Sequence, residues 1–475
     1  MVDSNGRWQL SRTLALVVLV AGCNVVAPGQ GAATSSVDSS PTREAFLKSE
    51  LESANASLDP AAREEKYSAM EASAFAFFRA TDHLYFTDIQ NGVIAFPASW
   101  ASTAEIRTWI QGDLHPQNVG YFGTKDGVVV LDLDDFDESY LAPFYYDLVR
   151  FVAGVHLMRP DVSFNFSRSE AEDVSFDSFL SEYQSTLAAV NGKSTETTIV
   201  LSSENLSGFT KDKADDLASS TNAALLDKYT VKVGGVRTFD VTNPDLAAMT
   251  SSDNTEISTG YASYTASLGS FYGSKPASYW TIKSQAVRLH SGLGSLGRTK
   301  YYLLLEGPTA GQDDDILLEV KESTYPTMLT SAESAQLSTY DAQFASHGSR
   351  ASTANKAMLD KVDDHLGYMD TALRSYVVHR ISPYKFGFDA EDFTSQTDLA
   401  NFAKYCARAT AYAHARADKD YDTSYVSYNF ENGALDAIAA WPNAKTTMAT
   451  LGEAYSDQVL ADYALFLDLR AAGEL

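Results

Sequence analysis

The stretch Gln111-Gly112-Asp113-Leu114-His115-Pro116-Gln117-Asn118 lies directly before a predicted β-hairpin. Residues 118–122 and 128–131 are rich in β-branched and aromatic side chains, and turn-forming residues at 125–127 separate the two runs. A tight turn places the termini of its two strands side by side. The hairpin is therefore expected to bring residues 111–118 next to the acidic segment Asp132-Leu133-Asp134-Asp135-Phe136-Asp137-Glu138.

These two segments together contain the side chains that phosphoryl transfer requires. A carboxylate must orient the attacking hydroxyl group, while an amide oxygen and a second carboxylate hold Mg²⁺ against the phosphates. Asp113 precedes Asn118 by five positions, and the acidic segment supplies further carboxylates. Other interpretations stay open: turn formers and caps, a solvated acidic edge, or a Ca²⁺ loop, although the segment lacks the Gly and Glu positions of an EF-hand.

A glycine-rich motif, Gly292-Leu293-Gly294-Ser295-Leu296-Gly297, matches the pattern G-x-G-x-x-G. A dinucleotide-binding fold would place a helix after this motif, but residues 298–305 have the composition of a strand. In the strand–loop–strand arrangement, backbone N–H groups close over nucleotide phosphates. That arrangement predicts a lysine on the next strand, and Lys321 ends the strand-like run 315–320. A lone lysine after a strand is commonly a surface residue, but the order of elements favours a phosphate contact.

These blocks, together with residues 75–79, 147–150 and 413–416, resemble the bacterial family DUF2252 over roughly residues 60–430. That family is related to the protein-kinase-like and aminoglycoside-phosphotransferase-like folds. The resemblance implies an α+β, two-lobed protein-kinase-like fold with a small antiparallel β lobe and a large helical lobe. Because the catalytic hairpin precedes the Gly-rich loop in this chain, the implied fold is circularly permuted.

The resemblance also implies roles for individual residues. Asp113 would be the catalytic base, and Asn118 and Asp135 would be metal ligands. Asp132 competes with Asp135 for the second role, because the register along the strand is open. The implied cofactors are Mg²⁺ and ATP or another nucleoside triphosphate, and the acceptor is a hydroxyl group on an unknown small molecule or polymer. The implied nucleotide-binding residues are Gly292, Gly294, Ser295, Gly297 and Lys321.

Three neighbouring positions qualify this interpretation. Asp147 is expected to brace the catalytic loop rather than to touch substrate, and His115 resembles a loop histidine of phosphotransferases for which packing is an equally good role. The family tends to carry a Glu in the helix after the lysine strand, but this chain has Ser-Thr-Ala-Asn at 352–355. The usual acidic partner of Lys321 is therefore missing or lies elsewhere.

The rest of the chain is assigned by its hydrophobic periodicity. Helices are expected over residues 43–90 and a buried helix over 146–157. The kinase-like domain as a whole is placed at 43–475. Its predicted parts are a catalytic hairpin block at 111–150, a mixed and partly loop-like insertion at 190–275, a β lobe at 280–325 and a mainly helical lobe at 327–475.

The N-terminus has the features of an export signal. Arg7 and Arg12 precede an apolar run at 14–20 that is too short to span a bilayer. Leu19-Val20-Ala21-Gly22-Cys23 resembles the bacterial lipobox. The resemblance implies removal of residues 1–22, a lipid anchor on Cys23, a flexible tether over 23–42 and a location on the periplasmic or extracellular face of the cell envelope. The alternative is an ordinary cleaved signal peptide.

Composition limits the class of protein. The chain has 475 residues, and its 36 Lys+Arg against 62 Asp+Glu give a formal charge of −26. The acidic excess argues against a nucleic-acid partner and against broad adhesion to anionic lipid. A hydrophobic content of 45% supports a sizeable core and excludes wholesale disorder. Two cysteines exclude a disulfide scaffold.

Together these features predict a lipid-anchored, kinase-like phosphotransferase. One alternative is a catalytically weak or inactive envelope lipoprotein that binds a nucleotide, phosphorylated or sugar ligand in the same cleft. A second alternative is a structural lipoprotein that keeps only the scaffold. The set Asp113, Asn118, Asp135 and Lys321 favours the first, while the export signal and the missing helix Glu favour the binding protein.

Overall fold

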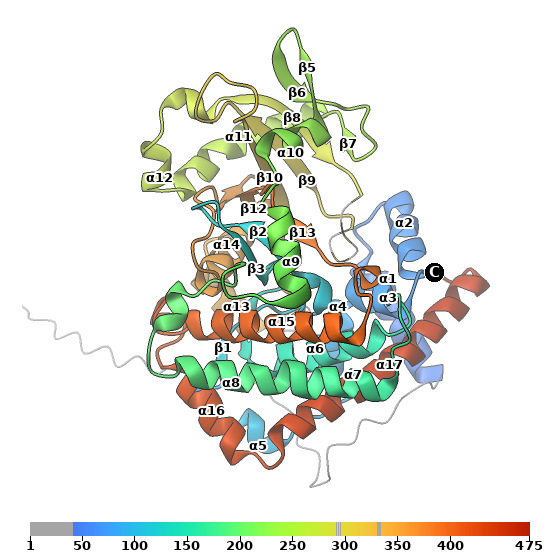
Figure 1. The fold of residues 1–475 in the computed structure, drawn as a ribbon. Helices are drawn as coiled ribbons and strands as arrows, with labels where there is room; N and C mark the ends of the chain where they lie inside the picture. The colour runs from blue at the N-terminus through green and yellow to red at the C-terminus, as the bar shows by residue number, and fades with distance from the viewer. Residues whose placement is uncertain (1–40, 291, 293, 295, 330–333) are drawn as a thin grey trace, which may run out of the picture. The chain divides into compact units, whose positions relative to one another are not determined.

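The structure is a computed structural model that describes residues 41–475 except 291, 293, 295 and 330–333. It shows a mixed α+β fold in which small antiparallel sheets lie among many helices (Figure 1). The predicted signal peptide, the lipidation site Cys23, most of the predicted tether and the Gly-loop residue Ser295 lie outside the described residues.

The elements follow one another in a largely helical chain with two β-rich segments. The α-helices are α1 (Pro41–Ala54), α2 (Pro60–Met70), α3 (Ala74–Ala80), α4 (Asp82–Gln90), α5 (Ala98–Ala101), α6 (Tyr145–Leu157), α7 (Arg168–Asp173), α8 (Ser181–Val190), α9 (Gly208–Leu217), α10 (Asn222–Tyr229), α11 (Ser251–Ser267), α12 (Ser270–Gly273), α13 (Ser334–Gln343), α14 (His347–Met358), α15 (Gln396–Arg416), α16 (Phe430–Ala440) and α17 (Ala444–Ala472). The strands are β1 (Arg107–Ile110), β2 (Val119–Gly123), β3 (Val129–Leu133), β4 (Tyr140–Pro143), β5 (Thr230–Val233), β6 (Val236–Phe239), β7 (Leu246–Ala247), β8 (Ile282–Arg288), β9 (Lys300–Leu305), β10 (Ile316–Ser323), β11 (Gly367–Asp370), β12 (Ser375–Arg380) and β13 (Phe386–Gly387).

The largest sheet has six antiparallel strands in the order β11-β12-β10-β9-β8-β7. Its central strands are buried on both faces, because successive residues of a strand point to opposite sides. Leu303 and Leu305 of β9 pack with α11 residues on one face, and Leu304 packs with α10 on the other. Lys321 shares the face of Leu317, which is four residues before it on β10.

Two smaller ladders flank the segments that the sequence analysis singled out. The strand β1 pairs with β4, with Ile110 opposite Tyr140, and β2 pairs with β3, with Val119 opposite Leu133. The chain leaves β1 through residues 111–118 to reach β2, and it leaves β3 through residues 134–139 to reach β4. The two connections therefore lie side by side, as the hairpin pattern predicted.

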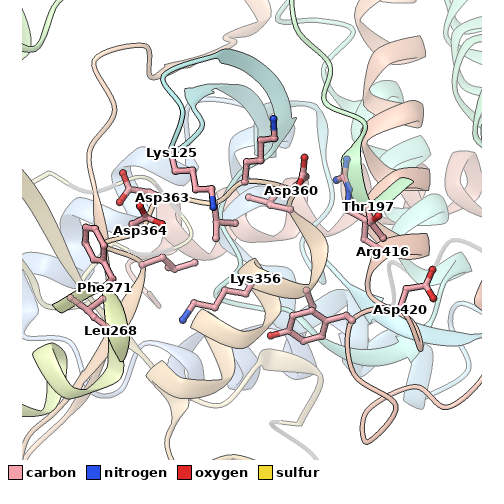
Figure 2. Close-up of a pocket in the computed structure, with 16 residues that line it drawn as sticks. Lys125, Thr197, Leu268, Phe271, Lys356, Asp360, Asp363, Asp364, Arg416 and Asp420 are labelled. Atoms are coloured by element: carbon pink, nitrogen blue, oxygen red, sulfur yellow. The ribbon is translucent and has the colours of Figure 1, made fainter. Parts of the chain in front are cut away.

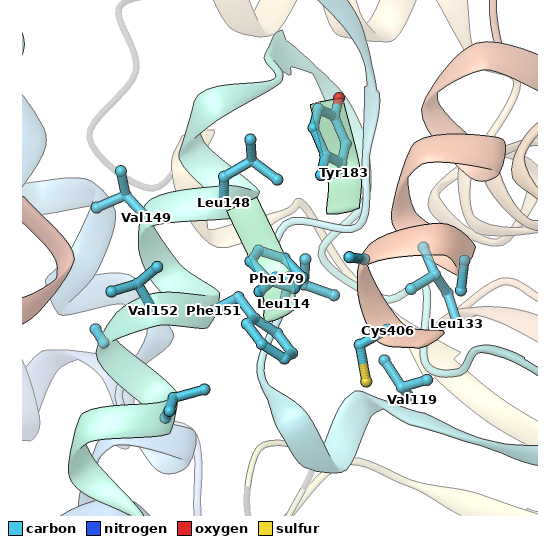
Figure 3. Close-up of a cluster of buried hydrophobic side chains, with 14 of the residues drawn as sticks. Leu114, Val119, Leu133, Leu148, Val149, Phe151, Val152, Phe179, Tyr183 and Cys406 are labelled. Carbon is cyan, nitrogen blue, oxygen red and sulfur yellow. The ribbon is translucent and has the colours of Figure 1, made fainter. Parts of the chain in front are cut away.

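A helical core supports these connections from below the hairpin. Figure 3 shows side chains of α6, α15 and the hairpin meeting there, with Leu114 between Phe151 and Cys406. Leu114 is fully buried, which anchors the polar connection at its centre. Cys406 is a free, buried thiol in the described part of the chain. Because both flanks of the connection enter this core, Asp113 is held on a rigid support.

The hairpin, the helices before it and α6 agree with the sequence patterns, and the structure adds detail in two regions. The segment 190–275 contains well-formed helices, of which the 17-residue α11 covers the six-stranded sheet. The stretch after 327, expected to be mainly helical, also contributes β11 and β12 to that sheet. Strands of the sheet therefore come from both sides of residues 280–325. Within the described residues, no helix is both long enough and apolar enough to cross a bilayer.

Candidate functional site

The connection between β1 and β2, residues 111–118, depends on a glycine near its start. Gly112 has a φ of +90°, and a Cβ at this position would lie 2.3 Å from the backbone oxygen of Glu138. The neighbouring Gln111 donates from Nε2 to the backbone oxygen of Asp135 at 2.5 Å. The two connections thus touch through backbone atoms, and this close approach leaves no room for a side chain at residue 112.

Helix α6 fixes the connection through two side chains that lie one turn apart. Asp147 accepts hydrogen bonds from the backbone N–H groups of Gln111 at 2.7 Å and of Gly112 at 2.9 Å. His414 of α15 contacts the same carboxylate at 3.1 Å and Tyr183 at 2.9 Å. Asp147 therefore braces the loop from behind, as expected from the sequence, and His414 holds Asp147 in place.

Asp113 lies next to Arg150, the second of these α6 side chains. The Arg150 guanidinium donates to Asp113 Oδ1 through Nε at 2.8 Å and also through Nη2, and it forms an ion pair with Asp82 at 3.0 Å. Asn118 donates from Nδ2 to the backbone oxygen of Asp113 at 2.9 Å. Burial raises the pKa of Asp113 to about 6 against the opposing effect of Arg150.

Lys321 of β10 directly contacts the acidic connection, which is formed by residues 134–139 between β3 and β4. Its Nζ lies 2.8 and 2.9 Å from the two carboxylate oxygens of Asp135 and 2.7 Å from Asp137 Oδ2. Burial favours the neutral form of Asp135, but the adjacent ammonium outweighs it and holds the pKa of that carboxyl well below its usual range. Asp135 also has a φ of +60°, a conformation that is costly for a residue with a side chain and that clusters at functional sites.

The described part of the Gly-rich loop lies over the same place. A Cβ on Gly294 would lie 3.9 Å from Asp113 Oδ2, and Gly297 has a φ of +91°. A cavity of about 320 Å³ is lined by both of these glycines and by Asp113 and Asp135. The strand β9 follows Gly297 after a short turn, which agrees with the predicted strand–loop–strand order.

Comparison with known proteins identifies the family of this chain. The model of the family described as "Uncharacterized protein conserved in bacteria (DUF2252)" matches residues 58–469. The chain belongs to the DUF2252 family. No curated protein and no solved structure matches it. The matched range contains the hairpin, the Gly-rich loop, Lys321 and most of the residues that line the cavity; Ala54, Asn55 and Ser57 of the lining precede it.

Two residues considered for this DUF2252 site lie away from the cavity or serve packing. Asp132 is buried on β3 and forms an ion pair with Arg416 at 3.4 Å; burial raises its pKa to about 6. Its place on the strand turns it away from the cavity that Asp135 lines. His115 packs its ring against Phe75 and Phe78, and burial lowers its pKa well below the usual value.

Helix α14, in which the sequence comparison expected a Glu, contributes a different buried side chain. The family position falls on α14, whose buried Arg350 donates to the backbone oxygens of Phe136 and Ser139, each at 3.0 Å. Lys321 takes its acidic partners from the connection after β3 instead. Arg350 and Arg150 carry no local sequence signal of such roles, because both act through contacts between distant segments.

A second cavity, of about 450 Å³, lies elsewhere in the DUF2252 chain (Figure 2). Lys125, Lys356 and Asp360 line it, and Arg416 borders it from α15. None of the predicted catalytic, metal-binding or nucleotide-binding residues lies in this lining. Of those residues, Asp113, Asp135, Gly294 and Gly297 line the cavity of about 320 Å³. Asn118 and Lys321 are not part of that lining, but they contact Asp113 and Asp135, which are.

The described oxygen donors in and beside that cavity do not form an all-protein metal cage. Among residues 41–475, with the gaps given above, no three His, Cys, Asp or Glu side chains are arranged to hold a metal ion. Asn118 donates from Nδ2 to Asp113, so a metal would bind its Oδ1. Of the carboxylates of residues 134–139 that line the cavity, Asp135 is the most exposed, with 38% of its side chain accessible. Mg²⁺ commonly takes one or two protein oxygens and completes its shell with phosphate and water.

Proposed function

We propose that this DUF2252 protein is a kinase-like phosphotransferase that moves a phosphoryl group from a magnesium-bound nucleoside triphosphate to a hydroxyl group of a small molecule or polymer. The observation that carries the proposal is the ion pair between Lys321 and Asp135, residues 186 positions apart. It joins the lysine strand to the catalytic hairpin at a cavity that also contains Asp113 and the Gly-rich loop. A purely structural role gives no reason for these groups to meet in a hollow.

Asp113 is suited to accept the proton of the attacking hydroxyl group. The acceptor oxygen would form a bond to the terminal phosphorus, the bond from that phosphorus to the nucleoside diphosphate would break, and the proton would pass to Asp113 Oδ2. Arg150 holds Oδ1, so the other oxygen remains directed to the Gly294 side of the cavity. With a pKa of about 6, Asp113 is ionised at neutral pH and can act as a base.

Lys321, Asn118 and Asp135 would hold the donor. Lys321 would pair with the inner phosphates, and Asn118 and Asp135 would bind Mg²⁺, which neutralises charge on the phosphates when bound. Gly292, Gly294, Ser295 and Gly297 would supply the positions of the loop at which the backbone can approach the phosphates closely. The six-stranded sheet and the hairpin would then correspond to the two lobes of a circularly permuted kinase-like fold, with the lobes in the reverse chain order.

The export of the protein forms part of the same proposal. The lipobox-like sequence at Cys23 supports anchoring at the cell envelope on the periplasmic or extracellular side. The sequence does not identify the phosphoryl donor at that location. A second function, ligand binding with weak or no catalysis, is favoured by one observation. Helix α14 offers Arg350 in place of the acidic partner that active relatives of the fold are expected to carry.

Thermal unfolding of the full protein tests the donor site. ATP or GTP with Mg²⁺ is expected to raise the midpoint of the wild type but not of Lys321→Ala. Lys419→Ala, which changes an exposed lysine away from the cavity, is the matched control and keeps the shift. Stabilisation that needs no metal, or that sugars alone produce, would support the binding function instead.

A second pair of variants tests catalysis. Asp113→Asn is expected to keep nucleotide binding and to lose turnover, because the amide accepts no proton from the hydroxyl group. Asp126→Asn at the exposed hairpin turn is the matched control and keeps both. Turnover unchanged in Asp113→Asn would exclude Asp113 as the base.

A further inference from the structure

Two cations line the cavity without a direct acidic partner. Lys66 of α2 is only 8% exposed, and within the described chain no carboxylate lies within ion-pair distance of its ammonium. Arg79 of α3 also lines the cavity, and its buried Nε has no hydrogen-bond partner among the described residues. Neither residue entered the site predicted from the sequence, although Arg79 belongs to the block at 75–79 that resembles the family.

The carboxylates of the cavity are, by contrast, each paired. Arg150 holds Asp82 and Asp113, and Lys321 holds Asp135 and Asp137. Glu138, which contributes to the electrostatic surroundings of Lys66, accepts from Arg298 at 2.9 Å and from the Thr327 backbone at 2.5 Å. Lys66 and Arg79 are therefore cations of the cavity wall that form no direct ion pair with a carboxylate of the described residues.

An unpaired buried cation destabilises a fold unless a ligand compensates for it. Burial and the neighbouring Arg298 lower the pKa of Lys66 to about 8, which shows the strain of keeping this group charged. A chain with 62 acidic residues has many carboxylates with which such a cation could pair. The position of both cations in the cavity wall points to an anion supplied from outside the chain.

The backbone of Arg79 lies beside Gly294, and its side chain belongs to the wall of the cavity that Asp113 also lines. A Cβ on Gly294 would lie 3.5 Å from the Arg79 backbone oxygen and 3.9 Å from Asp113 Oδ2. Asp113 and Asp135 contribute to the electrostatic surroundings of the Arg79 guanidinium without forming an ion pair with it. A guanidinium in the wall of a cavity that Asp113 and Gly294 also line suits the oxygens of a phosphoryl group.

We propose that Lys66 and Arg79 are phosphate-binding residues that hold a terminal phosphate group in this cavity, beside Asp113. The inference rests on the proposed function for the identity of the donor, but the binding of phosphate itself does not. Two sources share the chemistry: the terminal phosphate of the nucleotide and a phosphate on the acceptor. The test below distinguishes them.

Binding of inorganic tripolyphosphate, measured by calorimetry without nucleotide or metal, is the first test. The wild type is expected to bind, and Lys66→Gln and Arg79→Gln are each expected to bind about tenfold to a hundredfold more weakly, as for loss of a hydrogen bond to a charged group. Lys66→Arg and Arg79→Lys keep the charge and are expected to recover part of the affinity. Absence of tripolyphosphate binding by the wild type would overturn the inference.

Stability of the ligand-free variants separates this role from a structural one. Removing an unpaired buried cation is expected to raise the urea midpoint of Lys66→Gln or to leave it unchanged. A cation that serves only to balance the acidic residues of the cavity would lower the midpoint when removed and would leave tripolyphosphate binding intact. That pair of results would also overturn the inference.

Nucleotides identify the source of the phosphate. If Arg79→Gln weakens ATP but not ADP, the terminal phosphate of the nucleotide is the ligand. If it weakens inorganic phosphate while saturating ADP is present, the phosphate belongs to the acceptor. Tripolyphosphate binding without any nucleotide binding would keep this inference and refute the phosphotransferase. Turnover and ATP affinity unchanged in both variants would refute this inference alone.

Discussion

Replacement of Lys321 by Met tests whether the joint between β10 and the hairpin is as strong as its geometry indicates. The ammonium forms ion pairs of 2.8 Å with Asp135 and 2.7 Å with Asp137, and the lysine is almost fully buried. Removing one partner of a buried pair costs roughly 3–5 kcal/mol, because the remaining charge keeps its desolvation penalty. Asp135 is partly exposed and can be hydrated, so we expect a loss of about 3 kcal/mol.

A double variant locates the origin of that loss. In Lys321→Met, Asp137 keeps only Arg298, at 3.2 Å. Adding Asp137→Asn removes the stranded charge, and the double variant is expected to be more stable than Lys321→Met by about 1–2 kcal/mol. The free energy of unfolding in urea measures both effects, with Lys419→Met expected to stay within about 0.5 kcal/mol of wild type. A Lys321→Met variant as stable as that control would refute the ion-pair reasoning.

Three other changes give sharp expectations. Gly112→Ala is expected to destabilise by more than about 3 kcal/mol in urea unfolding, because its Cβ would meet the Glu138 backbone oxygen at 2.3 Å and its φ is +90°; wild-type stability would contradict the close approach. Asp147→Asn, which loses one charged acceptor for two backbone N–H groups, is expected to cost about 2–4 kcal/mol and to abolish tripolyphosphate binding, and intact binding would show that the brace is dispensable. Burial raises the pKa of Glu431 to about 8. Above about pH 4.5 the unfolded state loses this proton while the folded state keeps it, so the free energy of unfolding falls as the pH rises to 8. Glu431→Gln is expected to remove roughly 2 kcal/mol of that fall between pH 5 and pH 8, whereas the exposed Glu204→Gln leaves the slope unchanged.

The hairpin could be predicted because its information is local. Runs of β-branched and aromatic residues and the turn at Gly127 specify β2 and β3 without reference to the rest of the chain. The strands β11 and β12 were missed because they are short and contain polar residues. The strand β11 pairs with β12, and β12 in turn pairs with β10, in which Lys321 lies opposite Val377. No pattern within residues 367–380 contains that partner.

The candidate site also combines residues that local sequence patterns indicate with residues that only contacts between distant segments reveal. Motif spacing was enough to select Asp113 and Lys321, but it left Asp132 and Asp135 as competitors. The structure places Asp132 on β3, opposite Gly120 and paired with Arg416, whereas Asp135 follows the strand and lines the cavity. Lys66 and Arg79 could not be selected from sequence, because what distinguishes them is the lack of a partner in three dimensions.

The connection between β3 and β4 receives contacts from both the sheet and the helices. Lys321 of β10 binds Asp135, Arg350 of α14 binds the Phe136 backbone oxygen, and Gln111 binds the Asp135 backbone oxygen. A phosphate that draws Lys321 toward itself must weaken its hold on Asp135 and alter a junction on which both parts of the fold rest. Ligand binding at this cavity should therefore change the stability of the whole protein, with a size set by how far metal or Arg79 replaces the lost contact. A ligand that shifts the unfolding midpoints of the wild type and of Lys321→Met by the same amount would have to bind away from Lys321.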